Sequence, residues 1–186
     1  MIIVEGPDGA GKSTLIKTLV PWLNEVLLDE WSLAERVVGK DTKTSVNLRA
    51  WTDENLAKGF HTTVYDRHRL LSDPIYSVAM GKNMEFGGLY EFPWLLEAWN
   101  QLVECEPLII YCLPPYSLVQ RNVISDPDNL VTSPFIGSIY HGYVAQISML
   151  SSLYDGVLIY DYSERDSLEA LLENLRQELL WPILRM

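Results

Sequence analysis

A glycine-rich segment near the amino terminus holds the residues best suited to bind phosphate. It reads Gly6-Pro7-Asp8-Gly9-Ala10-Gly11-Lys12-Ser13-Thr14 and fits the pattern G-x-x-x-x-G-K-[ST] in full. Glycines let backbone N–H groups approach an anion, the Lys12 ammonium suits β- and γ-phosphates, and the Ser13 hydroxyl suits Mg²⁺. The pattern predicts a site for a nucleoside triphosphate and Mg²⁺, with the binding residues Gly6, Asp8, Gly9, Ala10, Gly11, Lys12, Ser13 and Thr14.

A second group of polar residues, Asp66, Arg67 and His68, follows a β-branched run. Asp66 is expected to hold Mg²⁺ with Ser13 or to orient a phosphate acceptor. The planar guanidinium of Arg67 is expected to clamp a phosphate. With Lys12, these two residues are the expected catalytic set. The simpler interpretation makes them a surface ion pair or a helix cap, and makes His68 a hydrogen-bonded structural residue.

The order of apolar segments indicates which elements position these residues. Strand-like runs lie at 2–4, 25–28, 62–65, 108–113 and 157–160, and helix-like patterns at 13–22, 45–58, 93–104, 117–125, 137–153 and 167–181. Strands that alternate with helices predict an α/β fold, with a parallel sheet covered by helices on both faces. Ligands bind at the carboxyl ends of such strands, and both polar groups follow strand-like runs. We expect a single domain, 1–186, with a lid-like segment at about 122–136.

Composition limits the classes of partner. The 14 Lys and Arg residues against 25 Asp and Glu give a net charge of −11, which argues against a generally basic nucleic-acid-binding surface but not against a local basic site. No apolar run is long enough to span a membrane. Two cysteines, Cys105 and Cys112, do not make a disulfide framework and fit a reducing compartment. These features predict a cytoplasmic protein that does not bind membranes.

Several motifs resemble those of thymidylate kinases. The stretch from Val4 to Thr14 looks like that family's phosphate loop, including the acidic residue within it. The Asp66-Arg67-His68 segment, with Ser72, Asp73 and Tyr76 after it, is similar to the family's Asp-Arg-Tyr/His segment. The resemblance is looser at Leu113-Pro114-Pro115 with Val119 and Arg121, but the order of motifs matches over most of the chain.

The resemblance implies a P-loop NTPase fold with a five-stranded parallel sheet, like that of nucleoside monophosphate kinases. It also implies ATP and Mg²⁺ as cofactors, and transfer of a phosphoryl group to a thymidine-type acceptor. By motif match, Lys12 and Ser13 are implied to bind ATP and Mg²⁺. Asp8, Asp66 and Arg67 are implied to lie on the acceptor side.

Two departures from the family concern the acceptor. Thymidylate kinases usually carry an Arg after their second strand that grips the acceptor's phosphate, but residues 28–32, after the strand expected at 25–28, contain none. The lid-like segment lacks the family's arginines, which leaves Arg121 at its edge as the expected contact to ATP. An alcohol acceptor must lose a proton, and Glu30, followed by Trp31, is the candidate catalytic base. The alternative is a solvent-facing acidic turn.

Three functions fit these observations, and we favour the first. It is a thymidylate kinase-like enzyme that phosphorylates a deoxynucleotide or deoxynucleoside. The second resembles a phage branch of the family, a 5-hydroxymethyl-deoxyuridine DNA kinase acting during thymine hypermodification. The third is a regulatory P-loop ATPase.

The partners differ between these functions. The first needs only a nucleotide or nucleoside acceptor. The second needs DNA that contains a modified pyrimidine, and a phage-encoded enzyme would act in the host cytoplasm. It would flip the base onto an aromatic side chain, for which the candidates are Trp31, Trp51, Phe86, Tyr90 and Trp94. The alternative is that these aromatic side chains pack in the core. The sequence is compatible with a homodimer.

Overall fold

The strands form one parallel sheet with the glycine-rich loop following its central strand. The computed structural model describes residues 1–26, 35–38, 63–81 and 92–180. The strands are β1 (Ile2–Glu5), β2 (Glu35–Val38), β3 (Thr63–Asp66), β4 (Leu108–Cys112) and β5 (Val157–Tyr160). All neighbouring pairs are parallel, in the order β2-β3-β1-β4-β5. The expected α/β class with a parallel sheet is therefore confirmed.

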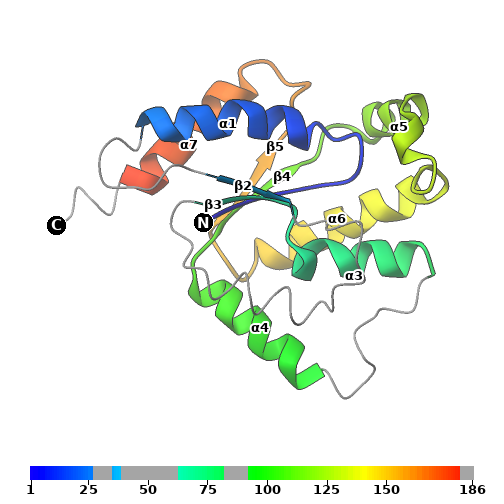
Figure 1. Cartoon of the computed structure of the whole chain (residues 1–186), viewed down its shortest axis with the longest axis horizontal. Coiled ribbons are helices and arrows are strands. Elements are labelled where there is room, and N and C mark those ends of the chain that lie inside the picture. The colour runs from blue at the N-terminus through cyan, green and yellow to red at the C-terminus, as the bar shows by residue number, and fades with distance from the viewer. Residues whose placement is uncertain (27–34, 39–62, 82–91, 181–186) are drawn as a thin grey trace.

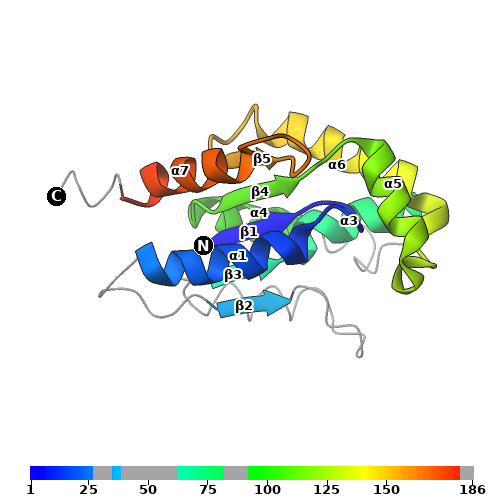
Figure 2. The same cartoon turned by 90° about the horizontal axis from the view of Figure 1, so that it is seen from above.

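Helices cover both faces of this sheet. The α-helices are α1 (Lys12–Val26), α3 (Arg69–Ala79), α4 (Phe92–Glu104), α5 (Tyr116–Ser125), α6 (Ile136–Leu150) and α7 (Ser167–Leu180). Helices α1 and α7 lie on one face, and α3, α4 and α6 lie on the other (Figures 1 and 2). Two short 3₁₀ helices, η2 (Pro127–Asn129) and η3 (Ser133–Phe135), connect α5 to α6. None of the helices in the described ranges is long and apolar enough to cross a membrane.

Alternation along β1 explains how one strand supports both layers. Ile2 and Val4 are buried in the cluster that includes Leu19 of α1 and Leu175 of α7. Ile3, between them in sequence, is buried in the cluster on the opposite face. Because successive strand side chains point to opposite faces, three consecutive apolar residues anchor β1 between two cores. The loop that follows β1 therefore starts from a fixed position.

The second strand lies later in the chain than expected. The strand expected at 25–28 is wrong, since Glu25 and Val26 belong to α1 and β2 spans Glu35–Val38. Helix α1 continues because Leu19 and Leu23, four residues apart, keep its apolar face buried. The helix expected at 45–58 lies outside the described residues. The other expected elements overlap those observed and differ only at their ends.

Candidate active site

The glycine-rich loop leaves β1 and turns directly into α1. Gly6 has a φ of 136°, and a Cβ at this position would collide with the carbonyl oxygen of Cys112 on β4. Only glycine fits so close to the neighbouring strand. The N–H groups of Thr14 and Leu15 donate to the Gly11 carbonyl at 3.1 and 3.0 Å, which begins the helix. The loop therefore precedes a helix amino terminus, the usual arrangement for anion binding.

Lys12 is held inside this loop. Its Nζ donates to the carbonyl oxygen of Pro7 at 2.6 Å, and the residue is only 7% exposed. Burial, and next the positive charge of Arg67, lower the pKa of Lys12 to about 7. A phosphate oxygen in the loop would reverse this shift, because a nearby anion favours the ammonium form. The lysine is thus placed where an anion would be its natural partner.

The exit of β3 brings Arg67 against Asp8 of the loop. Val4 of β1 is in register with Asp66, and the Arg67 N–H donates to the Val4 carbonyl at 3.0 Å. Nη2 of Arg67 donates to Asp8 Oδ1 at 2.5 Å and to the Tyr76 hydroxyl at 2.8 Å. Arg67 is 4% exposed and Asp8 9%. The alternative of a surface pair therefore does not describe Arg67, whose partner is in the loop.

Arg67 keeps its charge in this setting. Burial alone lowers the pKa of Arg67, but the Tyr76 and Tyr143 hydroxyls and the Asp8 carboxylate around it raise the pKa above its ordinary value. The guanidinium also lies over the Tyr76 ring, 5.1 Å from its centroid. A permanently charged, oriented guanidinium therefore lies beside the loop.

His68 and Glu5 form a buried support beneath the site. The His68 N–H donates to Glu5 Oε1 at 2.6 Å, and the Tyr143 hydroxyl of α6 donates to Glu5 Oε2 at 3.1 Å. His68 is 1% exposed and its ring meets Tyr65 edge-on. These contacts favour the structural interpretation of His68. Glu5 is the last residue of β1, and a carboxylate at the end of an apolar strand is the sequence signal that could have pointed to it.

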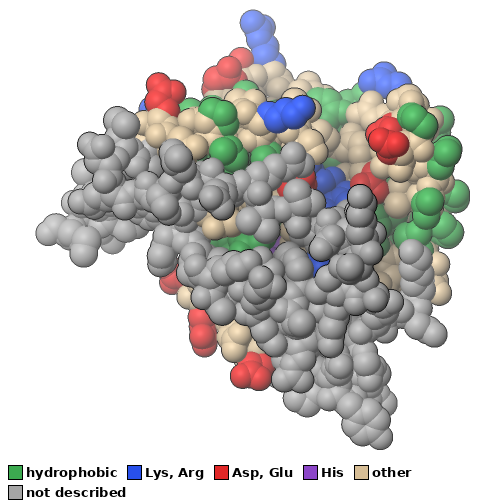
Figure 3. Space-filling model, viewed as in Figure 1, with side chains coloured by type: hydrophobic (Ala, Val, Ile, Leu, Met, Phe, Trp, Pro, Cys, Tyr) green, Lys and Arg blue, Asp and Glu red, His purple; other side chains and the backbone are tan. Residues whose placement is uncertain are grey.

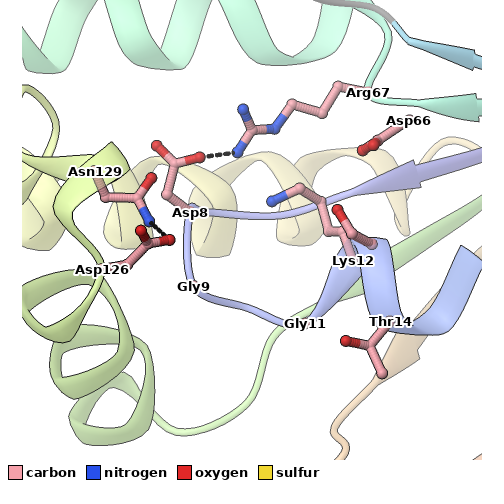
Figure 4. Close-up of a pocket in the computed structure, with 10 residues that line it drawn as sticks. Asp8, Gly9, Gly11, Lys12, Thr14, Asp66, Arg67, Asp126 and Asn129 are labelled. Atoms are coloured by element: carbon pink, nitrogen blue, oxygen red, sulfur yellow. Dashed lines mark hydrogen bonds and ion pairs between the residues drawn. The ribbon is translucent and has the colours of Figure 1, made fainter.

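A pocket of 310 Å³ collects the loop, the β3 exit and the segment after α5. Figure 4 shows Lys12, Asp66, Arg67 and Asp8 arranged around one space, with Asp126 and Asn129 on its far side. Its lining residues are Asp8, Gly9, Gly11, Lys12, Ser13, Thr14, Asp66, Arg67, Asp126 and Asn129. Gly6 and Ala10 are buried outside the lining. Arg121 is exposed on α5 and is also not part of it.

The oxygen donors of the pocket suit Mg²⁺. The Ser13 hydroxyl and the Asp66 carboxylate line the same space. Within the described ranges, no group of three His, Cys, Asp or Glu side chains forms a metal site by itself. Mg²⁺ is usually held by one or two protein oxygens together with substrate phosphates. Ser13 and Asp66 fit this donor set.

Asp126 and Asn129 are pocket residues that sequence reasoning did not assign. Asp126 accepts hydrogen bonds from the Asp128 N–H at 3.0 Å and from Asn129 Nδ2 at 2.8 Å. This turn starts η2, and the Asp-Pro-x-Asn sequence is a signal for it. Neither bears a positive charge, so this edge of the pocket differs from the arginine-bearing lid of the family that the sequence resembles.

The position of β2 changes which residues follow this strand, and these are the residues expected near the acceptor. Glu30 comes before β2 in sequence rather than after its carboxyl end, so the reason for choosing it as a base no longer holds. The segment that follows β2 begins Gly39-Lys40-Asp41 and includes Lys43, so cations do follow this strand in sequence. These residues, Glu30 and the five aromatic candidates have side chains outside the described part of the chain.

Comparisons with known proteins identify the fold. No protein-family model matches the chain, and no curated protein sequence matches it. The YorR protein from Bacillus subtilis, in complex with phosphorylated GDP, superposes with a TM-score of 0.64 at 16% identity, covering 95% of this chain and 96% of that one. Deoxyadenosine kinase from M. mycoides with bound dCTP gives 0.62 at 13% identity, covering 95% and 100%. The same kinase with products dCMP and dCDP gives 0.59 at 17% identity, covering 95% and 98%. The chain therefore shares its fold, over almost its whole length, with nucleotide-bound structures that include a deoxynucleoside kinase.

Proposed function

We propose that this protein is an ATP-dependent phosphotransferase that moves the γ-phosphate of ATP to a thymidine-type deoxynucleotide or deoxynucleoside. The observation that carries the proposal is one pocket that contains both Lys12 of the glycine-rich loop and Arg67 of the β3 exit. A cation set in an anion-binding loop, with a second cation fixed nearby, suits the charge that develops during phosphoryl transfer. The shared fold with a deoxynucleoside kinase is consistent with this chemistry.

The loop and the β3 exit divide the roles in this proposal. The loop N–H groups bind the β- and γ-phosphates, and Lys12 exchanges the Pro7 carbonyl for a γ-phosphate oxygen. Ser13 and Asp66 would hold Mg²⁺, which would supply charge neutralisation for the phosphates. Arg67, oriented by Asp8, stabilises the transferring group or the acceptor.

A second candidate function has its own supporting observation. No Lys or Arg occurs between residues 122 and 136, and Asp126 lines the pocket there. Such an edge suits an uncharged hydroxyl better than an acceptor phosphate. The hydroxyl of 5-hydroxymethyluracil in DNA is an acceptor of this kind, and so is that of a free nucleoside. The candidate base Glu30 is not needed for either, because Asp126 also offers a carboxylate at the pocket.

One labelling experiment tests the proposal and separates the candidates. The protein is incubated with γ-labelled ATP and, in parallel, dTMP, thymidine, deoxyadenosine, and DNA with or without 5-hydroxymethyluracil. We expect label on a free thymidine-type acceptor. Label only in the modified DNA would favour the second candidate, and release of phosphate without any labelled acceptor would favour a regulatory ATPase.

A matched pair of lysine variants shows whether the loop is responsible. Lys12→Ala is expected to lower the transfer rate by on the order of 100-fold or more, since it removes a cation from the developing charge. Lys17→Ala changes an exposed lysine on the same helix and should leave the rate unchanged. Equal activity of the Lys12 and Lys17 variants would contradict the proposal.

A further inference from the structure

Helix α5 lies against the outer side of the glycine-rich loop, and Asn122 is its polar contact there. Nδ2 of Asn122 donates to the Gly9 carbonyl at 2.9 Å and to the Tyr162 hydroxyl at 2.8 Å. A Cβ on Gly9 would lie 2.9 Å from Cγ2 of Val123 and 3.0 Å from the Val119 carbonyl oxygen. The helix is thus in direct contact with Gly9, and both valines are buried.

The orientation of the Gly9 carbonyl sets the orientation of the next N–H group. The two groups belong to one planar trans peptide and point in opposite directions. With the carbonyl on Asn122, the Ala10 N–H is directed at the Pro7 carbonyl, 3.4 Å away. The same Pro7 oxygen accepts from Lys12 Nζ at 2.6 Å. The bond from Ala10 is long and weak, so a phosphate oxygen bound near Lys12 could replace the Pro7 carbonyl for both donors.

This orientation needs a partner because Gly9 has a φ of 75° and belongs to the residue type with the most backbone freedom. Without Asn122, the peptide between Gly9 and Ala10 would lose the hydrogen bond that fixes its direction. Rotation of this peptide would turn the Ala10 N–H away from the inside of the loop.

Tyr162 holds Asn122 from the other side. It follows β5, and its ring lies over Gly11, where an added Cβ would come within 3.0 Å of Cδ1. Its hydroxyl accepts the second Nδ2 hydrogen of Asn122. One amide therefore links α5, the loop after β5 and the glycine-rich loop.

We propose that Asn122 is a positioning residue that fixes the Gly9–Ala10 peptide so that its N–H faces a bound phosphate. The inference rests on the proposed function in that the ligand of the loop is a triphosphate. Asn122 then affects how tightly the loop binds the phosphate groups, and it does not affect binding of the nucleoside. The loss on mutation should therefore be the same for ATP and for a triphosphate that has no nucleoside.

The test measures binding of Mg·ATP and of inorganic tripolyphosphate to the full chain by calorimetry. Asn122→Leu keeps the approximate volume and removes both donated bonds. We expect affinity for both ligands to fall by about fivefold, the effect of losing the one neutral hydrogen bond that orients the Gly9 carbonyl. Gln120→Leu is the matched control, an amide-to-leucine change at an exposed position on the same helix, and should bind as the wild type does.

A second variant and a direct readout guard against a folding defect. Asn122→Ser has a side chain too short to reach Gly9 and should show the same loss. In the ligand-free protein, the NMR amide signal of Ala10 should shift in both Asn122 variants and not in Gln120→Leu.

Two results would overturn the inference alone. One is wild-type affinity for both ligands in the Asn122 variants, and the other is a loss for ATP with none for tripolyphosphate, which would mean a contact to the nucleoside. If the wild-type protein binds neither ligand, the proposed function and the inference both fail.

Discussion

Arg67 is a buried cation whose backbone and side chain are both constrained. Its φ of 69° lies in the left-handed region, which non-glycine residues adopt at a cost. The Arg67 N–H bond to Val4, and the neighbouring His68 N–H bond to Glu5, hold the backbone in this conformation. The guanidinium is aimed at Asp8 as a result. We infer that the strained turn exists to place this charge beside the loop.

The pairing of Arg67 with Asp8 leads to a prediction about stability. Asp8→Asn removes the ion-pair partner of the buried guanidinium, and we expect the free energy of unfolding to fall by about 3 kcal/mol or more. Asp73→Asn is the matched control, because Asp73 pairs with Arg69 at 2.8 Å in a more exposed position. That change should cost about 0.5 kcal/mol. Urea unfolding measures both, and equal losses would refute the claim that the Asp8 pair is special.

Among the elements, α6 positions the site although it contributes no pocket residue. Its Tyr143 supports Glu5, and its Gln146 donates from Nε2 to the Leu71 carbonyl of α3 at 2.9 Å. Gly142 lies where α6 meets α3, and a Cβ there would come within 2.7 Å of Cγ2 of Ile75. The glycine thus allows two helices to approach closely behind the β3 exit.

This close approach predicts opposite effects of two similar substitutions on α6. Gly142→Ala should lower the free energy of unfolding by about 1–3 kcal/mol, because the β-branched Ile75 has little freedom to move. Gly137→Ala adds a methyl group on the same helix, 3.3 Å from the movable Tyr116 hydroxyl, and should be neutral or gain up to about 1 kcal/mol. Denaturant unfolding distinguishes them. A stabilised Gly142→Ala protein would show that the helices can separate at no cost.

Sequence patterns predicted those elements whose signals are local. The glycine-rich loop is indicated within a few residues by an apolar run, three glycines and the start of a helical pattern. Strand β5 is indicated by one apolar run. Strand β2 carries a weak signal, since it contains only two apolar residues after Glu35 and Arg36, whereas α1 extends to Val26 and so includes the first residues of the range where a strand was expected. The role of Asn122 depends on how α5 packs against a loop far away in sequence, which no local pattern encodes.

For the whole molecule, two buried groups give unfolding a pH dependence of opposite sign. Burial lowers the pKa of His68 to about 3, so the unfolded chain takes up a proton below its ordinary pKa and stability falls as the pH drops. Burial raises the pKa of Glu5 to about 7. The native protein keeps the Glu5 proton up to about pH 7, whereas the unfolded chain loses it above the ordinary pKa of a glutamate. The contribution of Glu5 to stability therefore declines as the pH rises towards 7.

Removing His68 should isolate one of these effects. Between about pH 7.5 and about pH 5, wild-type stability should fall by about 2 kcal/mol relative to that of His68→Gln. His141→Gln, at an exposed site on α6, is the control and should track the wild type. The measurement is urea unfolding of each protein at both pH values. A constant difference between wild type and His68→Gln would contradict the lowered pKa, because it would mean that the imidazole takes up its proton at the same pH in the native and the unfolded chain.

Charged side chains of both signs lie at the site of this acidic chain. Of the 14 basic residues, Lys12 and Arg67 line the pocket, within a molecule of net charge −11. Figure 3 shows basic and acidic side chains together in the hollow near the centre of the view. Hydrophobic side chains gather at the right, over α5 and the segment that follows it, where Ile124, Leu130 and Val131 are exposed. The pocket therefore combines the two cations with the carboxylates of Asp8, Asp66 and Asp126.

The pocket is built from three stretches of chain that lie far apart in sequence, 8–14, 66–67 and 126–129. None of the three is a site alone, and all of them meet only when β1, β3 and α5 are in place. Any occupant that touches all three binds the native chain and not its fragments. By mass action such an occupant would raise the melting temperature of the entire domain. The melting temperature would then rise with the concentration of the free occupant around the protein.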